Sequence, residues 1–177
     1  MKIVLWILAL LVVAVVGVLL YATTRPDSFR VERQATIHAP ADQIVPLLTD
    51  FHAWSRWSPW EKLDPAMKRT WSGAASGKGA AYAWDGNSKA GAGRMEITEA
   101  SPAKVAIQLD FSRPFTAHNL AEFTLEPQGD ATRVTWAMSG PMPYVSKVMC
   151  VFIDMDKLIG KDFETGLANL QATVGKP

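Results

Sequence analysis

The chain contains a single cysteine, Cys150, so no disulfide bond can form within it. The lone thiol therefore does not identify a redox compartment. Positive charge is not in excess either, because the formal net charge is only +1. Domains that bind nucleic acid usually carry a pronounced basic patch, so no nucleic-acid partner is predicted. The sequence also lacks internal repeats and low-complexity tracts.

Motifs for metal, phosphate and acid–base chemistry are missing too. The three histidines, His38, His52 and His118, lie far apart and share no ligand spacing with each other or with Cys150, so no metal site is predicted. The glycines at positions 73, 77, 79, 86, 91 and 93 do not follow the strand, glycine-rich turn and helix of a phosphate loop, and we expect them in turns and bulges. We predict no cofactor, and the catalytic residues, if any, stay unknown.

Charge is also absent from a long stretch near the N-terminus. The run from Ile3 to Ala22 is uncharged throughout. A helix of this length spans about 30 Å, the thickness of the hydrocarbon core of a bilayer. A cleaved signal peptide is the main alternative, but its apolar part is usually shorter and ends at a small-x-small site, which residues 19–23 do not provide. We therefore predict an uncleaved transmembrane anchor over residues 1–22.

The membrane orientation depends on opposing signals. Lys2 favours a cytoplasmic N-terminus, whereas Arg25, Arg30 and Arg33 on the other side of the span argue the opposite by the positive-inside rule. We expect a single-pass protein of a bacterial inner membrane with its globular domain on the periplasmic side.

The rest of the chain reads as a linker, residues 23–28, and one domain, residues 29–177, which is long enough for a hydrophobic core. Alternating apolar residues predict a first strand over residues 29–39, followed by short helical and aromatic segments up to residue 60. A period of two then predicts an antiparallel meander. Its strands are expected at residues 67–72, 80–84, 93–100, 103–113, 117–126 and 132–140.

The last segment changes period. Apolar residues recur at spacings of three and four, which predicts one long amphipathic helix over about residues 144–172. On this helix Asp156 falls between Phe152 and Phe163, within the apolar stripe. A carboxylate that faces a cavity must be hydrogen-bonded, paired or protonated. Asp156 is therefore either a structural hydrogen-bond acceptor, a polar anchor for a ligand head group, or a proton-transfer group.

The order of these elements resembles the helix-grip fold of the START-like SRPBCC superfamily, in its polyketide cyclase/dehydrase branch. The resemblance covers about residues 29–170, and it is carried by the segments at residues 37–41, 51–60, 77–87 and 160–164. It implies an α+β fold with a curved antiparallel sheet of about seven strands wrapped around the C-terminal helix, with a cavity between them.

The chain contains seven tryptophans and seven phenylalanines, and rings of this size fill a core or line a large apolar cavity. In the helix-grip fold the strand alternation predicts which side chains face the cavity. Three of the tryptophans lie after the first strand, where they either gate the cavity mouth or close one end. The predicted ligand-binding residues are Trp54, Trp57, Trp60, Trp84, Leu109, Phe111, Asn119, Phe123, Trp136, Met138, Phe152 and Asp156.

The function that these features favour is a membrane-anchored domain that binds a hydrophobic or amphipathic small molecule such as a lipid. The predicted partners are this ligand and the membrane, through residues 3–22, while a protein partner stays unknown from the sequence. One alternative is a cyclase or dehydratase that uses Asp156 as acid or base, although the absence of a catalytic constellation argues against it. Another is an interaction module similar to the chaperone activators of the same superfamily.

Overall fold

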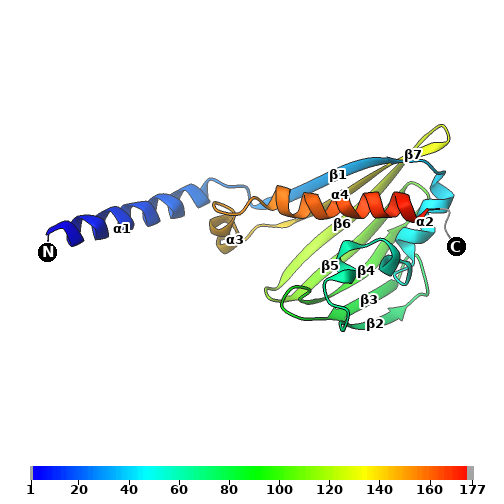
Figure 1. The fold of residues 1–177 in the computed structure, drawn as a ribbon, viewed down its shortest axis with the longest axis horizontal. Helices are drawn as coiled ribbons and strands as arrows, with labels where there is room; N and C mark the ends of the chain where they lie inside the picture. The colour runs from blue at the N-terminus through cyan, green and yellow to red at the C-terminus, as the bar shows by residue number, and fades with distance from the viewer. Residues whose placement is uncertain (1, 175–177) are drawn as a thin grey trace.

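The computed structural model describes residues 2–174 (Figure 1). Its elements in chain order are α1 (Lys2–Thr23), β1 (Ser28–Ile37), α2 (Ala41–Thr49), η1 (Ala53–Arg56), η2 (Pro59–Lys62), β2 (Lys68–Gly73), β3 (Ala80–Asp85), β4 (Ala92–Ala100), β5 (Lys104–Arg113), β6 (Ala117–Gln128), β7 (Ala131–Pro141), α3 (Tyr144–Met149) and α4 (Met155–Thr173).

The strands form one antiparallel sheet of seven strands in the order β1-β7-β6-β5-β4-β3-β2. Strands β2 to β7 are neighbours in chain order, and β1 pairs with β7, so β1 and β2 are the two edges of the sheet. Figure 1 shows α4 lying across one face of the sheet, while α1 projects away from the side where α3 lies. The predicted α+β helix-grip architecture is confirmed.

The two ends of the sheet adjoin different helices. β1 begins at Ser28, shortly after α1, and its partner β7 ends at Pro141 beside it. Because neighbouring strands are antiparallel, the turn between β5 and β6 lies at this same end. We call this the α1 end and the opposite end, where β1 leads into α2, the α2 end.

Helix α1 keeps its apolar side chains on the outside. Of the residues in α1, only Ala22 is buried. Within the described part of the chain, α1 is long and apolar enough to cross a membrane. Its length and composition agree with the predicted span.

The predicted alternation of the strands is confirmed in the core. Val105 and Ile107 of β5, Phe123 of β6 and Trp136 of β7 are all buried. Phe123 and Trp136 are cross-strand partners, which places their rings side by side on the face covered by α4.

The C-terminal segment differs from the prediction, because it forms two helices instead of one. α3 ends at Met149 and α4 begins at Met155. The side chain of Asp154 accepts a hydrogen bond from the backbone N–H of Lys157 and so caps a new helix N-terminus. The apolar spacing continues through this break, but a new helix starts with its own phase, so residues before and after it no longer share one face.

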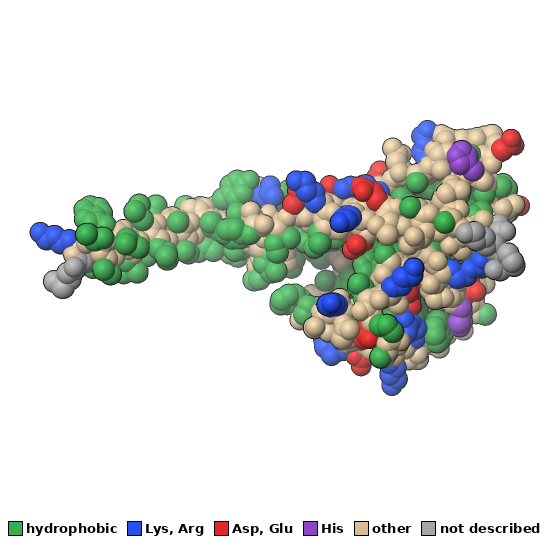
Figure 2. Space-filling view, in the orientation of Figure 1, with side chains coloured by type: hydrophobic (Ala, Val, Ile, Leu, Met, Phe, Trp, Pro, Cys, Tyr) green, Lys and Arg blue, Asp and Glu red, His purple; other side chains and the backbone are tan. Residues whose placement is uncertain are grey.

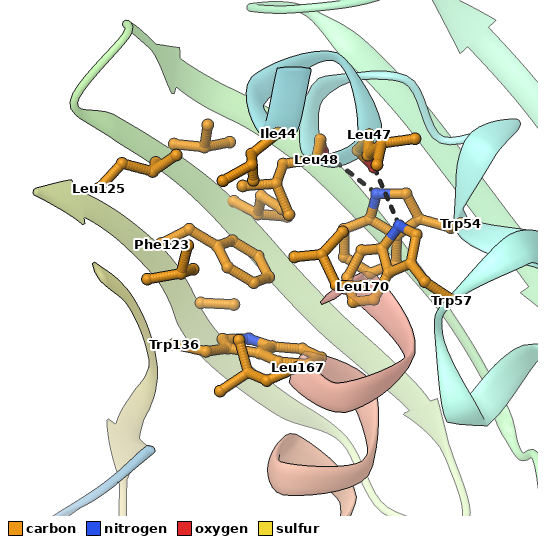
Figure 3. Close-up of a cluster of buried hydrophobic side chains, with 14 of the residues drawn as sticks. Ile44, Leu47, Leu48, Trp54, Trp57, Phe123, Leu125, Trp136, Leu167 and Leu170 are labelled. Atoms are coloured by element: carbon orange, nitrogen blue, oxygen red, sulfur yellow. Dashed lines mark hydrogen bonds between the residues drawn. The ribbon is translucent and has the colours of Figure 1, made fainter. Parts of the chain in front are cut away.

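The aromatic segment after β1 packs into the core at the α2 end. The indole N–H of Trp54 donates to the carbonyl of Leu48 (3.1 Å), and that of Trp57 donates to the carbonyl of Leu47 (3.0 Å), as Figure 3 shows. Both rings are buried with their polar atoms satisfied. Of the two predicted roles, closing one end of the groove is the one this position supports.

Candidate ligand-binding groove

The inward-facing side chains of β5 and β6 become more exposed to solvent toward the α1 end. On β5, Val105 and Ile107 are 0% and 1% exposed, whereas Leu109 and Phe111, farther along the same face, are partly exposed. On β6 exposure also rises from Phe123 to Ala117. The space between sheet and helix, which we call the groove, is therefore filled at the α2 end, and we call its partly exposed stretch toward the α1 end the open half.

Aromatic packing explains why the α2 end is filled. The ring of Trp136 stacks on Phe163 of α4, with centroids 4.3 Å apart and planes 6° apart. Phe123 lies 4.8 Å away on the other strand, and Trp57 and Trp60 meet Trp136 edge-on at 5.5 and 5.4 Å. These rings form the centre of the core, part of which is drawn in Figure 3. These rings therefore fill the α2 end of the predicted cavity.

The open half is lined by apolar side chains around one amide. Leu109 of β5 is the cross-strand partner of Asn119 on β6. Asn119 is buried on the inward face, as predicted, and its side chain occupies the space that a side chain at Gly140 would need. Met138 of β7 is also buried next to this position. Asn119 thus places a polar group within an apolar wall.

The far wall of the open half is aromatic. Phe111 meets Trp84 of β3 edge-on, with centroids 5.6 Å apart. The indole N–H of Trp84 donates to the carbonyl of Ala90 (3.0 Å), which fixes the ring orientation. Gly93 lies under this ring, and a Cβ there would come within 2.6 Å of it. The missing side chain at Gly93 is therefore what lets the Trp84 ring lie over β4.

A pocket of about 480 Å³ lies at the same end, between the start of β1 and the connection from α3 to α4. Its walls include Phe29, Val31, Met142, Phe152 and Asp156. Two of the predicted ligand-binding residues therefore line a pocket, although not the one between sheet and helix that the spacing suggested.

The inward positions predicted for Phe152 and Asp156 are wrong. Phe152 is 74% exposed, because it lies in the break between the two helices. Asp156 lies in the first turn of α4, and its carboxylate forms a bidentate ion pair with the guanidinium of Arg33, at 2.8 and 3.0 Å. The phase that placed both residues inside assumed an unbroken helix.

Sequence reasoning missed the importance of Arg33. It occupies the otherwise apolar face of β1, and that position was the available signal. Its Nε also donates to Glu164 (2.8 Å), and the guanidinium lies against Gly160, where a side chain would displace it. Arg33 therefore joins β1 to two turns of α4.

Replacing Asp156 with asparagine tests this ion pair. The hydrogen bonds from Arg33 hold the pKa of Asp156 below its usual value, so the pair stabilises the fold above the unfolded-state pKa of about 3.9. That contribution is lost as the pH falls through the lower folded-state pKa. We expect Asp156→Asn to fold and to lower the melting temperature slightly at pH 7, because exposed ion pairs contribute little. The difference from the wild type should disappear in acid.

Asp130→Asn, in the exposed turn between β6 and β7, is the control for the loss of one carboxylate. Equal melting of the wild type and Asp156→Asn at every pH would contradict a structural role for the pair. A loss of bound ligand with unchanged stability would instead assign the carboxylate to the ligand.

A second polar cluster joins η2 to the edge of the sheet. Arg69 Nε donates to Glu61 Oε2 (2.8 Å), and the hydroxyl of Tyr82 donates to Glu61 Oε1 (2.7 Å). Burial, with the hydrogen bond to Glu61, raises the pKa of Tyr82, which stays protonated at neutral pH. The cluster holds η2, and with it Trp60, against the core.

Among residues 2–174, no group of three or more His, Cys, Asp or Glu side chains is placed to hold a metal ion.

Residues 28–175 match the family described as polyketide cyclase / dehydrase and lipid transport. The chain belongs to this family. The match confirms the resemblance to the SRPBCC superfamily, and it supports a ligand-binding domain of that type. Among curated protein sequences, none matches this chain.

Solved structures share the fold at low sequence identity. Protein CV1439 from Chromobacterium violaceum is 13% identical with a TM-score of 0.58, covering 86% of this chain and 100% of that one. The Aha1 dimer from Colwellia psychrerythraea is 18% identical with a TM-score of 0.60, covering 84% and 99%. DynU16, a putative protein in the dynemicin biosynthetic locus, is 16% identical with a TM-score of 0.56, covering 84% and 47%. At these identities the likeness concerns the fold alone.

Proposed function

We propose that this protein is a membrane-anchored domain that binds a hydrophobic or amphipathic small molecule, such as a lipid, in the open half of the groove. The observation that carries the proposal is the loss of cover along the inward face, from Val105 to Phe111, toward the α1 end. Apolar side chains that face a groove yet remain exposed suit an apolar ligand. The description of the family includes lipid transport and supports the same class of ligand.

Polar groups in and near the groove favour an amphipathic ligand over a purely apolar one. Asn119 offers an amide on the inward face. Deeper in, the indole N–H of Trp136 is buried and has no hydrogen-bond partner. A buried donor without an acceptor is unfavourable, and an oxygen atom on a ligand that reached it would satisfy it.

The anchor and its location form part of the proposal. Residues 1–22 hold the chain in a bacterial inner membrane, residues 23–28 link the anchor to the domain at 29–177, and the domain lies on the periplasmic side. Washing membranes with carbonate should leave the intact protein bound. N-terminal sequencing that begins near Thr23 would contradict the anchor.

A charge placed on the groove wall should abolish binding. We expect Phe111→Glu to remove the co-purifying ligand, because burying an unpaired carboxylate against apolar ligand atoms is costly. Ser112→Glu is the matched control, since Ser112 is exposed and points to the opposite face of the same strand. The measurement is mass spectrometry of lipid and other small molecules extracted with each full-length variant from detergent. Equal ligand content in the two variants would place the ligand elsewhere.

The enzymatic alternative receives less support. Arg33 holds both carboxylate oxygens of Asp156 and keeps its pKa below the usual value, which makes this group a poor general acid at neutral pH and a weaker base. No described contact favours the chaperone-activator alternative over ligand binding.

A further inference from the structure

Most of the exposed large hydrophobic side chains outside α1 gather at the α1 end of the domain, Leu63 and Trp71 being the exceptions among the described residues. Large hydrophobic residues usually lie scattered on a protein surface, and a cluster of them marks an interaction site. The members belong to α3, to the connection between α3 and α4, to the first turn of α4 and to the turn between β5 and β6. They are Tyr144, Val145, Met149, Phe152, Ile153, Leu158 and Phe115, and we call them the apolar rim.

The apolar rim continues the surface of α1. Figure 2 shows hydrophobic side chains that cover α1 and extend onto the adjoining part of the domain. The turn that carries Phe115, 67% exposed, reaches the same end from the opposite edge of the groove, because β5 ends and β6 begins there. The apolar rim therefore lies on both sides of the groove opening.

A direct hydrogen bond fixes the position of the apolar rim along the axis of α1. The hydroxyl of Tyr144 donates to the backbone carbonyl of Leu19 (2.9 Å), one turn before α1 ends. Lys147 of α3 is buried and pairs with the exposed Asp27, so α3 itself contributes no exposed charge to the apolar rim. Tyrosine side chains favour the membrane–water interface, which is where the end of a spanning α1 would place Tyr144.

We propose that the apolar rim is a docking surface for the lipid bilayer that α1 spans. Its side chains insert at the boundary between head groups and acyl chains, as the apolar face of an interfacial helix does. The groove then opens toward the bilayer, and an amphipathic ligand passes between membrane and groove without crossing bulk water. This inference rests on the proposed anchor and adds how the groove reaches its ligand.

The bilayer is favoured over a second copy of the chain as the occupant. The last turn of α1 touches α3 directly, so an inserted α1 holds the apolar rim beside the bilayer at all times. The effective concentration of the membrane at this surface is correspondingly high, whereas a second copy must arrive by diffusion.

Quenching by lipid nitroxides tests the depth of the apolar rim. The only native thiol is removed by Cys150→Ser, and an uncharged fluorophore is attached at Phe115→Cys in the full-length protein. The control carries the fluorophore at Ala103→Cys, in the exposed turn between β4 and β5 at the α2 end. In phosphatidylcholine vesicles with nitroxide near the head groups, we expect several-fold stronger quenching at position 115 than at position 103. Equal quenching at the two positions would overturn the proposal.

Substitutions within the apolar rim test whether its side chains are responsible for the lipid quenching at position 115. In the Phe115→Cys background, Val145→Asp and Phe152→Asp together should reduce lipid quenching and increase quenching by aqueous iodide, while Ala103→Asp should change neither. Lipid quenching that both rim substitutions leave intact would overturn the proposal. Disulfide cross-linking between copies of the unlabelled Phe115→Cys protein would overturn it as well.

Ligand content is measured in the same preparations. Bound ligand without docking would refute this inference alone, and docking without any bound ligand would refute the proposed binding function alone. Release of the protein by carbonate would refute the anchor on which both depend.

Discussion

Replacing Trp136 with alanine is expected to lower the free energy of unfolding by about 3–5 kcal/mol, the range for large aromatic residues removed from a packed core. The side chain is 2% exposed and lies between Phe123 and Phe163. Two strands and α4 meet at this ring, so the surrounding rings cannot close the space without moving whole elements. The loss of its unpaired N–H offsets part of the effect, because that donor has no partner in the folded protein.

Trp71 provides the matched control. It lies on the edge strand β2, is 42% exposed and stacks on His52 at 4.7 Å. It also contacts Tyr82, with ring centroids 5.8 Å apart. Its replacement by alanine should lower stability by about 1–2 kcal/mol, the contribution of two partly exposed aromatic pairs. Proteolysis of the full-length protein in detergent across a urea series measures both variants without relying on tryptophan fluorescence. If Trp136→Ala and Trp71→Ala lowered the free energy of unfolding by similar small amounts, Trp136 would border open space instead of a packed core.

The second large effect is expected at Gly166. Alanine inside a helix is usually more stable than glycine by about 1 kcal/mol. Here a Cβ would lie 2.6 Å from Cζ3 of Trp136 and 3.3 Å from Cδ of Pro59. Because the Trp136 ring is buried, α4 would have to move away from the sheet, and overpacking of this kind costs about 1–3 kcal/mol. We therefore expect Gly166→Ala to destabilise the protein despite its better helix propensity.

Gly160→Ala, in the same helix, separates the effect of tight packing from the effect of helix propensity. A Cβ there would meet the guanidinium of Arg33, which can swing away into solvent because it ends a flexible side chain. We expect Gly160→Ala to weaken the ion pairs of Arg33 with α4 and to lower stability less than Gly166→Ala. Proteolysis across the same urea series measures this pair as well. A stabilising Gly166→Ala would show that α4 packs less closely on Trp136 than the contacts indicate.

Local patterns were sufficient for much of the fold. Alternation with a period of two predicted the inward face of β5, β6 and β7, because successive side chains of a strand must point to opposite sides. The uncharged N-terminal run predicted α1 for a similar reason, since length and composition alone decide whether a helix can span a bilayer. The resemblance of four short segments to the SRPBCC superfamily predicted the helix-grip fold, and the family match confirms that resemblance.

The candidate site required the tertiary structure. The apolar spacing from α3 into α4 is continuous, and only the cap at Asp154 reveals the break that exposes Phe152 and turns Asp156 toward Arg33. Pairings such as this one join residues that are far apart in the chain, and single-strand patterns carry no information about them.

The sequence by itself determined which side chains of β5, β6 and β7 face the groove, because that depends only on the two-residue repeat of a strand. Only the tertiary structure decided how far the groove is filled, because cover depends on how rings from separate elements meet. Trp57, Trp136 and Phe163 close the α2 end, while Leu109 and Phe111 stay partly exposed at the α1 end. That difference in packing puts the candidate site at the end of the sheet next to α1.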